Sequence, residues 1–191
     1  MNLYIIFFIV ILNLIKNMEK KGNSDFVVIF DLDDTLWPFW VDTHISPPFH
    51  VKKVKENGEK ILEDRYGFEI KLYPEVMQIL EKAKKEGIIM GTVSRTLEPE
   101  YGKQVLKLLD IEKYFISCEF DTNKKTTPIK KIAKLAGIKE GIKRCILFDD
   151  ESINLNDNKN EGGVGVLINN GLNMKEFENG IKIFKSKLNE L

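Results

Sequence analysis

Two groups of acidic residues are the part of this sequence best suited to chemistry. Asp31 and Asp33 follow one apolar run, and Asp149 and Asp150 follow another. Side chains two positions apart in an extended backbone point to the same side, so Asp31 and Asp33 are expected to face one way. Carboxylates packed together raise one another's pKa, so their convergence indicates a bound cation. Oxygen ligands without histidine or cysteine favour Mg²⁺ over Zn²⁺.

A magnesium site of this kind implies a phosphorylated substrate. Mg²⁺ usually takes one or two protein carboxylates and leaves its other positions to water and substrate phosphate. One carboxylate can attack phosphorus to form an aspartyl-phosphate, and a second can protonate the leaving oxygen and later deprotonate water. Ser94 and either Lys124 or Lys125 offer a hydroxyl and an ammonium for the phosphate oxygens.

The elements that must position these residues are strands of a parallel sheet. Residues 26–30 are apolar and include three β-branched side chains, which is typical of a strand buried on both faces. Similar patterns predict strands at 88–93, 115–120, 145–148 and 162–168, and helices at 74–87, 98–109, 127–137 and 173–188. Alternating strands and helices predict an α/β fold, a parallel sheet flanked by helices that binds its ligand at the carboxyl ends of the strands.

The segment between the first strand and the first helix is expected to be a loop followed by a short hairpin. Pro47 and Pro48 exclude a helix or a central strand around them. Residues 61–73 alternate around Gly67, which is typical of a hairpin.

The composition gives no sign of a nucleic-acid partner. The 191 residues include 29 Lys plus Arg and 29 Asp plus Glu, so the formal net charge is zero. The length fits one ordinary domain, which we place at residues 26–191.

Residues 1–25 are expected to form an apolar extension before that domain. Residues 3–15 are apolar except for Asn13, but they are fewer than the roughly 20 residues of a membrane-spanning helix. A signal peptide would need basic residues before this run and a cleavage site after it. Three interpretations stay open: a dispensable extension with Met18 as an alternative start, a membrane or targeting segment, or packing against the domain. We expect a cytoplasmic protein, with membrane association through residues 3–15 as the alternative.

The motifs in their order along the chain resemble those of a known superfamily. DLDDT at 31–35, Ser94, a lysine before a helix and DD at 149–150 are similar to the four motifs of the haloacid-dehalogenase-like (HAD-like) hydrolases. Within that superfamily, the stretches FDLDDTLWPFWVDTH, LYPEV, SRT, KYFI and FDDE resemble the magnesium-dependent phosphatase-1 family. The resemblance extends from about residue 26 to the end and implies a Rossmann-like core without a cap domain.

The resemblance also implies roles for individual residues. Asp31 takes the place of the nucleophile and Asp33 that of the general acid and base. The side chains of Asp31 and Asp149 and the backbone carbonyl of Asp33 fall where the family holds Mg²⁺, with Asp150 supporting these ligands. The residues in phosphate-binding or substrate-binding positions are Leu32, Trp37, His44, Ser94, Arg95 and Lys125, with Lys124 as the weaker candidate for the motif lysine. Position 34, where many relatives have Tyr, is Asp34.

The activity implied by the resemblance is a Mg²⁺-dependent phosphomonoesterase. Its substrates would be phosphotyrosine-like groups or sugar and fructosamine phosphates, carried by a small molecule or a phosphoprotein. The alternative from a different class is a non-catalytic phosphoprotein-binding or phospho-receiver module that uses the same acidic pocket. Such a module would not need the second acid, Asp33.

Overall fold

The computed structural model describes residues 24–189. The expectations for residues 3–15 and for the start at Met18 therefore lie outside the described residues. Within 24–189, no helix has the length and apolar character that crossing a membrane requires.

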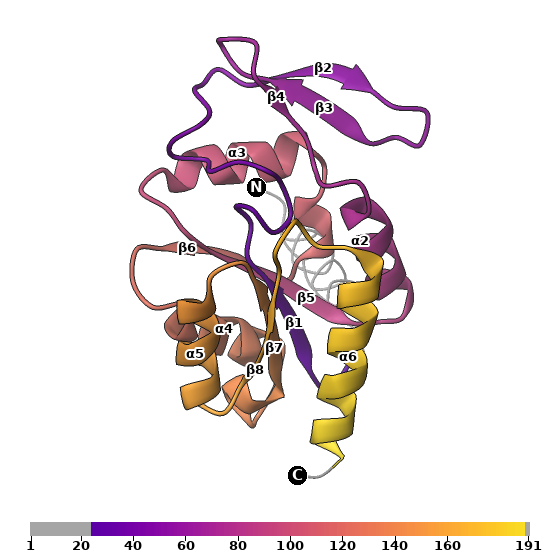
Figure 1. The fold of residues 1–191 in the computed structure, drawn as a ribbon, viewed down its shortest axis with the longest axis vertical. Coiled ribbons are helices and arrows are strands. Elements are labelled where there is room, and N and C mark those ends of the chain that lie inside the picture. The colour runs from indigo at the N-terminus through magenta and orange to yellow at the C-terminus, as the bar shows by residue number, and fades with distance from the viewer. Residues whose placement is uncertain (1–23, 190–191) are drawn as a thin grey trace, which may run out of the picture.

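A parallel sheet of five strands forms the centre of the molecule, in the order β6-β5-β1-β7-β8 (Figure 1). Its strands are β1 (Val27–Phe30), β5 (Ile89–Arg95), β6 (Cys118–Asp121), β7 (Cys145–Asp149) and β8 (Val164–Leu167). All neighbouring pairs are parallel, and Phe30 lies opposite both Thr92 of β5 and Phe148 of β7. This register brings the residues that follow β1 and β7, and the last residues of β5, to the same edge of the sheet.

Helices cover both faces of this sheet. They are α2 (Val76–Lys85), α3 (Pro99–Leu108), α4 (Thr126–Leu135), α5 (Ser152–Asn160) and α6 (Met174–Leu188), with 3-10 turns at Glu112–Tyr114 and Gly141–Arg144. In β1, Val28 and Phe30 belong to the core shared with α2, α3 and α6, whereas Val27 and Ile29 belong to the core shared with α4. Successive side chains of a strand point to opposite faces of the sheet, and helices cover both faces, so all four residues of β1 are buried.

The expected hairpin is part of a larger antiparallel sheet. The strands β2 (His50–Val54), β3 (Lys60–Glu63) and β4 (Glu69–Ile70) pair in that order and lie at one end of the molecule (Figure 1). The prediction missed β2, because all five of its residues are exposed and its HVKKV sequence has no buried face.

One missed helix and the starts of two other elements also differ from the prediction. Helix α5 was not predicted, because its sequence SINLNDNKN lacks an apolar stripe. Helix α4 begins at Thr126, one residue earlier than expected, and Lys125 is its N-cap residue. Strand β6 begins at Cys118, three residues later than expected, after the 3-10 turn at Glu112–Tyr114. The α/β architecture itself is confirmed.

Candidate active site

The acidic residues converge at the carboxyl edge of the central sheet. Asp31 follows β1, Asp149 ends β7, and Asp150 comes next along the chain. Each of these three side chains offers one oxygen, and the three oxygens lie within 4.8 Å of one another. The set contains only carboxylates, which are the ligands that a hard cation such as Mg²⁺ prefers, so the residues present fit a magnesium site.

Lys125 lies between two of these carboxylates. Its Nζ atom is 2.5 Å from Oδ1 of Asp31 and 2.7 Å from Oδ2 of Asp149, and all three side chains are buried. Burial would lower the pKa of Lys125, but the charges of Asp31 and Asp149 outweigh it and hold that pKa above its ordinary value. Burial raises the pKa of Asp31 well above its ordinary value, and the nearby Lys125 offsets only part of the rise.

The second acid of the first motif, Asp33, is held by its own loop. Its Oδ1 accepts a hydrogen bond from Nε1 of Trp37 at 2.7 Å, and its Oδ2 accepts one from the backbone N–H of Val41 at 3.2 Å. Burial raises the pKa of Asp33 to about 7, although both hydrogen bonds lower it. A carboxyl group with this pKa can both give and take a proton near neutral pH.

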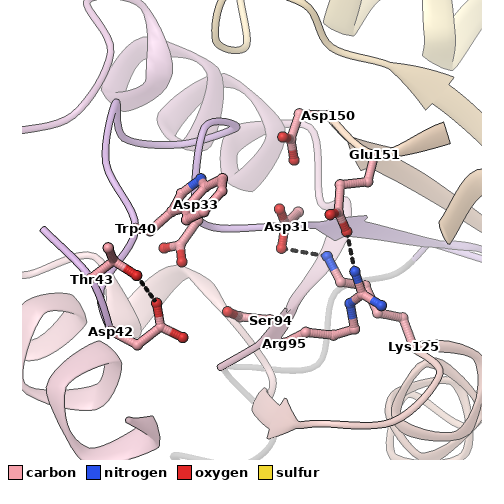
Figure 2. A pocket seen from close by; sticks show the side chains of 10 residues that line it. All are labelled: Asp31, Asp33, Trp40, Asp42, Thr43, Ser94, Arg95, Lys125, Asp150 and Glu151. Carbon is pink, nitrogen blue, oxygen red and sulfur yellow. Dashed lines mark hydrogen bonds and ion pairs between the residues drawn. The ribbon is translucent and has the colours of Figure 1, made fainter. Parts of the chain in front are cut away.

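One cavity of about 290 Å³ is lined by Asp31, Asp33, Lys125 and Asp150 among others. Its lining residues come from the loop after β1, the end of β5, the start of α4 and the turn after β7: Asp31, Asp33, Trp40, Asp42, Thr43, Ser94, Arg95, Lys125, Asp150 and Glu151. Figure 2 shows Lys125 and Arg95 on one side of Asp31 and Asp33 on the other. The cavity thus places a buried carboxylate between two cations and a second acid.

Similarity to known proteins agrees with this geometry. A model of the family described as Acid Phosphatase matches residues 25–187. The chain is 37% identical over 158 residues to Magnesium-dependent phosphatase 1 of Homo sapiens, a match that covers 83% of this chain and 86% of that protein. The chain belongs to the acid phosphatase family.

Two further comparisons concern the HAD-like fold. A HAD-like hydrolase superfamily protein of Schizosaccharomyces pombe is 37% identical over 148 residues, which cover 74% of this chain and 82% of that protein. The solved structure of a HAD-superfamily hydrolase from Ehrlichia chaffeensis has a similar fold, with a TM-score of 0.57 at 16% identity, and the match covers 83% of this chain and 96% of that one. The expected HAD-like fold is confirmed.

Most residues predicted for an acid phosphatase site lie in the cavity. The structure places Lys125 there and Lys124 outside it, where Lys124 pairs with Asp157 at 2.8 Å on an exposed surface. The carboxylate of Asp150 offers one of the three oxygens of the acidic cluster. Arg95, at the end of β5, forms an ion pair with Glu151 (Figure 2).

Three residues predicted to contact substrate do not line the cavity, namely Leu32, Trp37 and His44. The side chains of Leu32 and Trp37 are fully buried, so the Trp37 ring packs the loop and does not form a wall for substrate. Trp40, whose exposed fraction is 49%, lines the cavity instead. His44 lies beside Trp40, with the two rings stacked 5.8 Å apart and with His44 Nδ1 accepting the backbone N–H of Trp40 at 3.0 Å.

Sequence reasoning missed two residues that organise this acid phosphatase site. Asn154, in the first turn of α5, donates through Nδ2 to Oδ1 of Asp149 at 2.9 Å, and the missed helix concealed it. Asp42 accepts a hydrogen bond from Oγ1 of Thr96 at 3.3 Å, which joins the first loop to the turn after β5. No sequence signal could reveal that contact, because 54 residues separate its partners.

Proposed function

We propose that this protein is a Mg²⁺-dependent phosphomonoesterase that forms an aspartyl-phosphate on Asp31. The observation that carries the proposal is the position of Asp31, whose carboxylate lies in the cavity within 4.8 Å of other carboxylate oxygens and 2.5 Å from Nζ of Lys125. The positive charge of Lys125 lowers the pKa of Asp31 and so opposes the effect of burial, which favours the ionised, nucleophilic form of the carboxylate.

The acidic cluster would hold the metal. The side chains of Asp31 and Asp149 and the backbone carbonyl of Asp33 would be ligands, with Asp150 close enough to take part. Bound Mg²⁺ would neutralise charge on the phosphate oxygens and on Asp31. The magnesium dependence in the name of the human relative agrees with this donor set.

Three groups would bind the transferred phosphate. The hydroxyl of Ser94, the guanidinium of Arg95 and the ammonium of Lys125 all line the cavity beside Asp31. Donors and cations at these positions stabilise the charge that spreads over the equatorial oxygens as the phosphoryl group moves.

Asp33 would move the proton. An oxygen of Asp31 attacks phosphorus, the bond to the leaving oxygen breaks, and Asp33 gives that oxygen its proton. Asp33, now ionised, takes a proton from water as the water oxygen attacks the phosphorus of the aspartyl-phosphate. This second step releases inorganic phosphate and restores both carboxyl groups.

The substrates that we propose are phosphotyrosine-like groups and sugar or fructosamine phosphates. The cavity combines the half-exposed ring of Trp40 with polar groups of Asp42 and Thr43 beyond the phosphate-binding residues. An aromatic ring or a sugar face can stack on an indole, and hydroxyl or amino groups can hydrogen-bond to the polar side chains.

Asp31→Asn is the test of the nucleophile. We expect the variant to fold normally and to lose Mg²⁺-dependent phosphate release from p-nitrophenyl phosphate. Asp121→Asn is the matched control, because Asp121 ends β6, another strand of the same sheet, but does not line the cavity. Retained turnover in Asp31→Asn would exclude the aspartyl-phosphate mechanism. Binding of phosphate esters without turnover by the unaltered protein would favour the non-catalytic module.

A further inference from the structure

The indole of Trp37 makes the shortest hydrogen bond to Asp33 that the structure records. The distance from Trp37 Nε1 to Oδ1 of Asp33 is 2.7 Å, whereas the backbone N–H of Val41 reaches Oδ2 at 3.2 Å. Asp33 lines the cavity and Trp37 does not, so the indole binds the carboxyl group of Asp33 from the side away from the cavity.

Packing fixes the Trp37 ring. The side chain is fully buried, and it stacks on Phe39 with the ring centroids 5.3 Å apart and the planes 4° apart. Phe39 in turn meets the edge of Phe68, next to β4 of the small sheet. The N–H of Trp37 is therefore oriented when the protein folds, and no further ordering is needed when substrate binds.

We propose that Trp37 is a positioning residue for the general acid and base. Its N–H binds Oδ1 of Asp33 and fixes the plane of the carboxyl group. Oδ2, which accepts only the longer bond from the backbone N–H of Val41, is then the atom that gives its proton to the leaving oxygen. The inference rests on the role of Asp33 in the proposed function. It assigns Trp37 to the reaction without any contact between Trp37 and substrate.

A second indole provides a matched comparison within the same loop. Trp40 Nε1 donates to Oδ2 of Asp34 at 2.7 Å, the same distance as in the pair of Trp37 and Asp33. Trp37→Phe and Trp40→Phe each remove one indole N–H from a carboxylate and keep an aromatic ring. Only Trp37→Phe removes a hydrogen bond from Asp33, the acid that moves the proton.

The experiment measures kcat/KM for a series of substituted phenyl phosphates. General-acid help matters most when the leaving group is a poor one, so Trp37→Phe should lower kcat/KM about tenfold for phenyl phosphate and less than about twofold for p-nitrophenyl phosphate. Trp40→Phe should change both values by the same factor. The ratio of the two values does not depend on how much of a preparation is folded.

Asp33→Asn and the double variant Asp33→Asn/Trp37→Phe complete the test, measured in single turnovers with excess enzyme. If Trp37 acts through Asp33, the double variant has the same ratio as Asp33→Asn alone. A normal ratio in Trp37→Phe, or a further fall in the double variant, overturns the inference while the role of Asp33 stands. A normal ratio in Asp33→Asn overturns both.

Discussion

The Nζ atom of Lys125 lies 2.5 Å from Oδ1 of Asp31, although 94 residues separate them in the chain. The same ammonium reaches Oδ2 of Asp149 at 2.7 Å, so one buried cation balances two buried carboxylates. Asp149 is held further by Asn154 and by the backbone N–H of Glu151, both at 2.9 Å from Oδ1. Lys125 thus compensates negative charge in a cluster that also fits a divalent cation.

Lys125→Met is expected to destabilise the metal-free protein by about 3–5 kcal/mol, because it leaves buried carboxylates without their partner. Saturating Mg²⁺ supplies the missing positive charge, so the loss should be smaller with the metal. Urea unfolding in EDTA and in Mg²⁺ measures both values. Lys124→Met is the control and should change stability by less than about 1 kcal/mol, because Lys124 is exposed to solvent where it pairs with Asp157. Equal losses in EDTA and in Mg²⁺ would contradict this account.

The stability of the metal-free protein should fall as pH rises from about 4 to about 7. Burial raises the pKa of Asp31, Asp33 and Asp150, and that of Asp33 reaches about 7. The folded state therefore binds more protons than the unfolded state in this range, so a rise in pH favours unfolding. Asp33→Asn removes one of these groups. The free energy of unfolding of the variant should therefore exceed that of the unaltered protein by more at pH 7 than at pH 5. The measurement is urea unfolding in EDTA at both values, and an identical difference at each would contradict the prediction.

Asp34→Gly is expected to raise KM about threefold to tenfold, because Trp40 loses the acceptor that fixes its ring at the cavity. Asp34 has a φ of 52°, a left-handed conformation that glycine and asparagine both tolerate. Asp34→Asn keeps an oxygen acceptor and is the matched control, with KM near the normal value. Tryptophan fluorescence gives a second measurement, since released Trp40 becomes more accessible to acrylamide and buried Trp37 does not. Normal KM and normal quenching in Asp34→Gly would disprove the role of this contact.

Gly180→Ala should lower stability although alanine is the better helix former. Gly180 lies within α6, and a Cβ at this position would be 2.8 Å from Cζ of Phe148 and 2.9 Å from Cγ2 of Val166. The overpacking should cost about 1–3 kcal/mol, more than the roughly 1 kcal/mol of helix propensity gained. Asn179→Ala, at the exposed neighbouring position, should be neutral or stabilising. Thermal unfolding of both variants is the measurement, and a stabilised Gly180→Ala would show that α6 is not packed tightly on β7 and β8.

The sequence predicted the elements whose apolar pattern is strong. The helix predicted at 74–87 contains α2, whose apolar residues Val76, Ile79, Leu80 and Ala83 form the buried face, and Gly87 has a left-handed conformation after the helix ends. The prediction failed for β2 and α5, whose few apolar residues form no regular stripe and which are stabilised by their neighbours in space. Hydrophobic periodicity carries no information about such elements.

For the site, the sequence alone determined which acids, hydroxyl and lysines were candidates, because a strand that ends in carboxylates gives a local signal. Only the tertiary structure decided between Lys124 and Lys125 and placed Trp40 at the cavity and Trp37 behind Asp33. The physical reason is that adjacent residues face different directions once a helix begins or a loop closes. Which side chain meets a buried carboxylate depends on contacts between segments that are far apart in the chain.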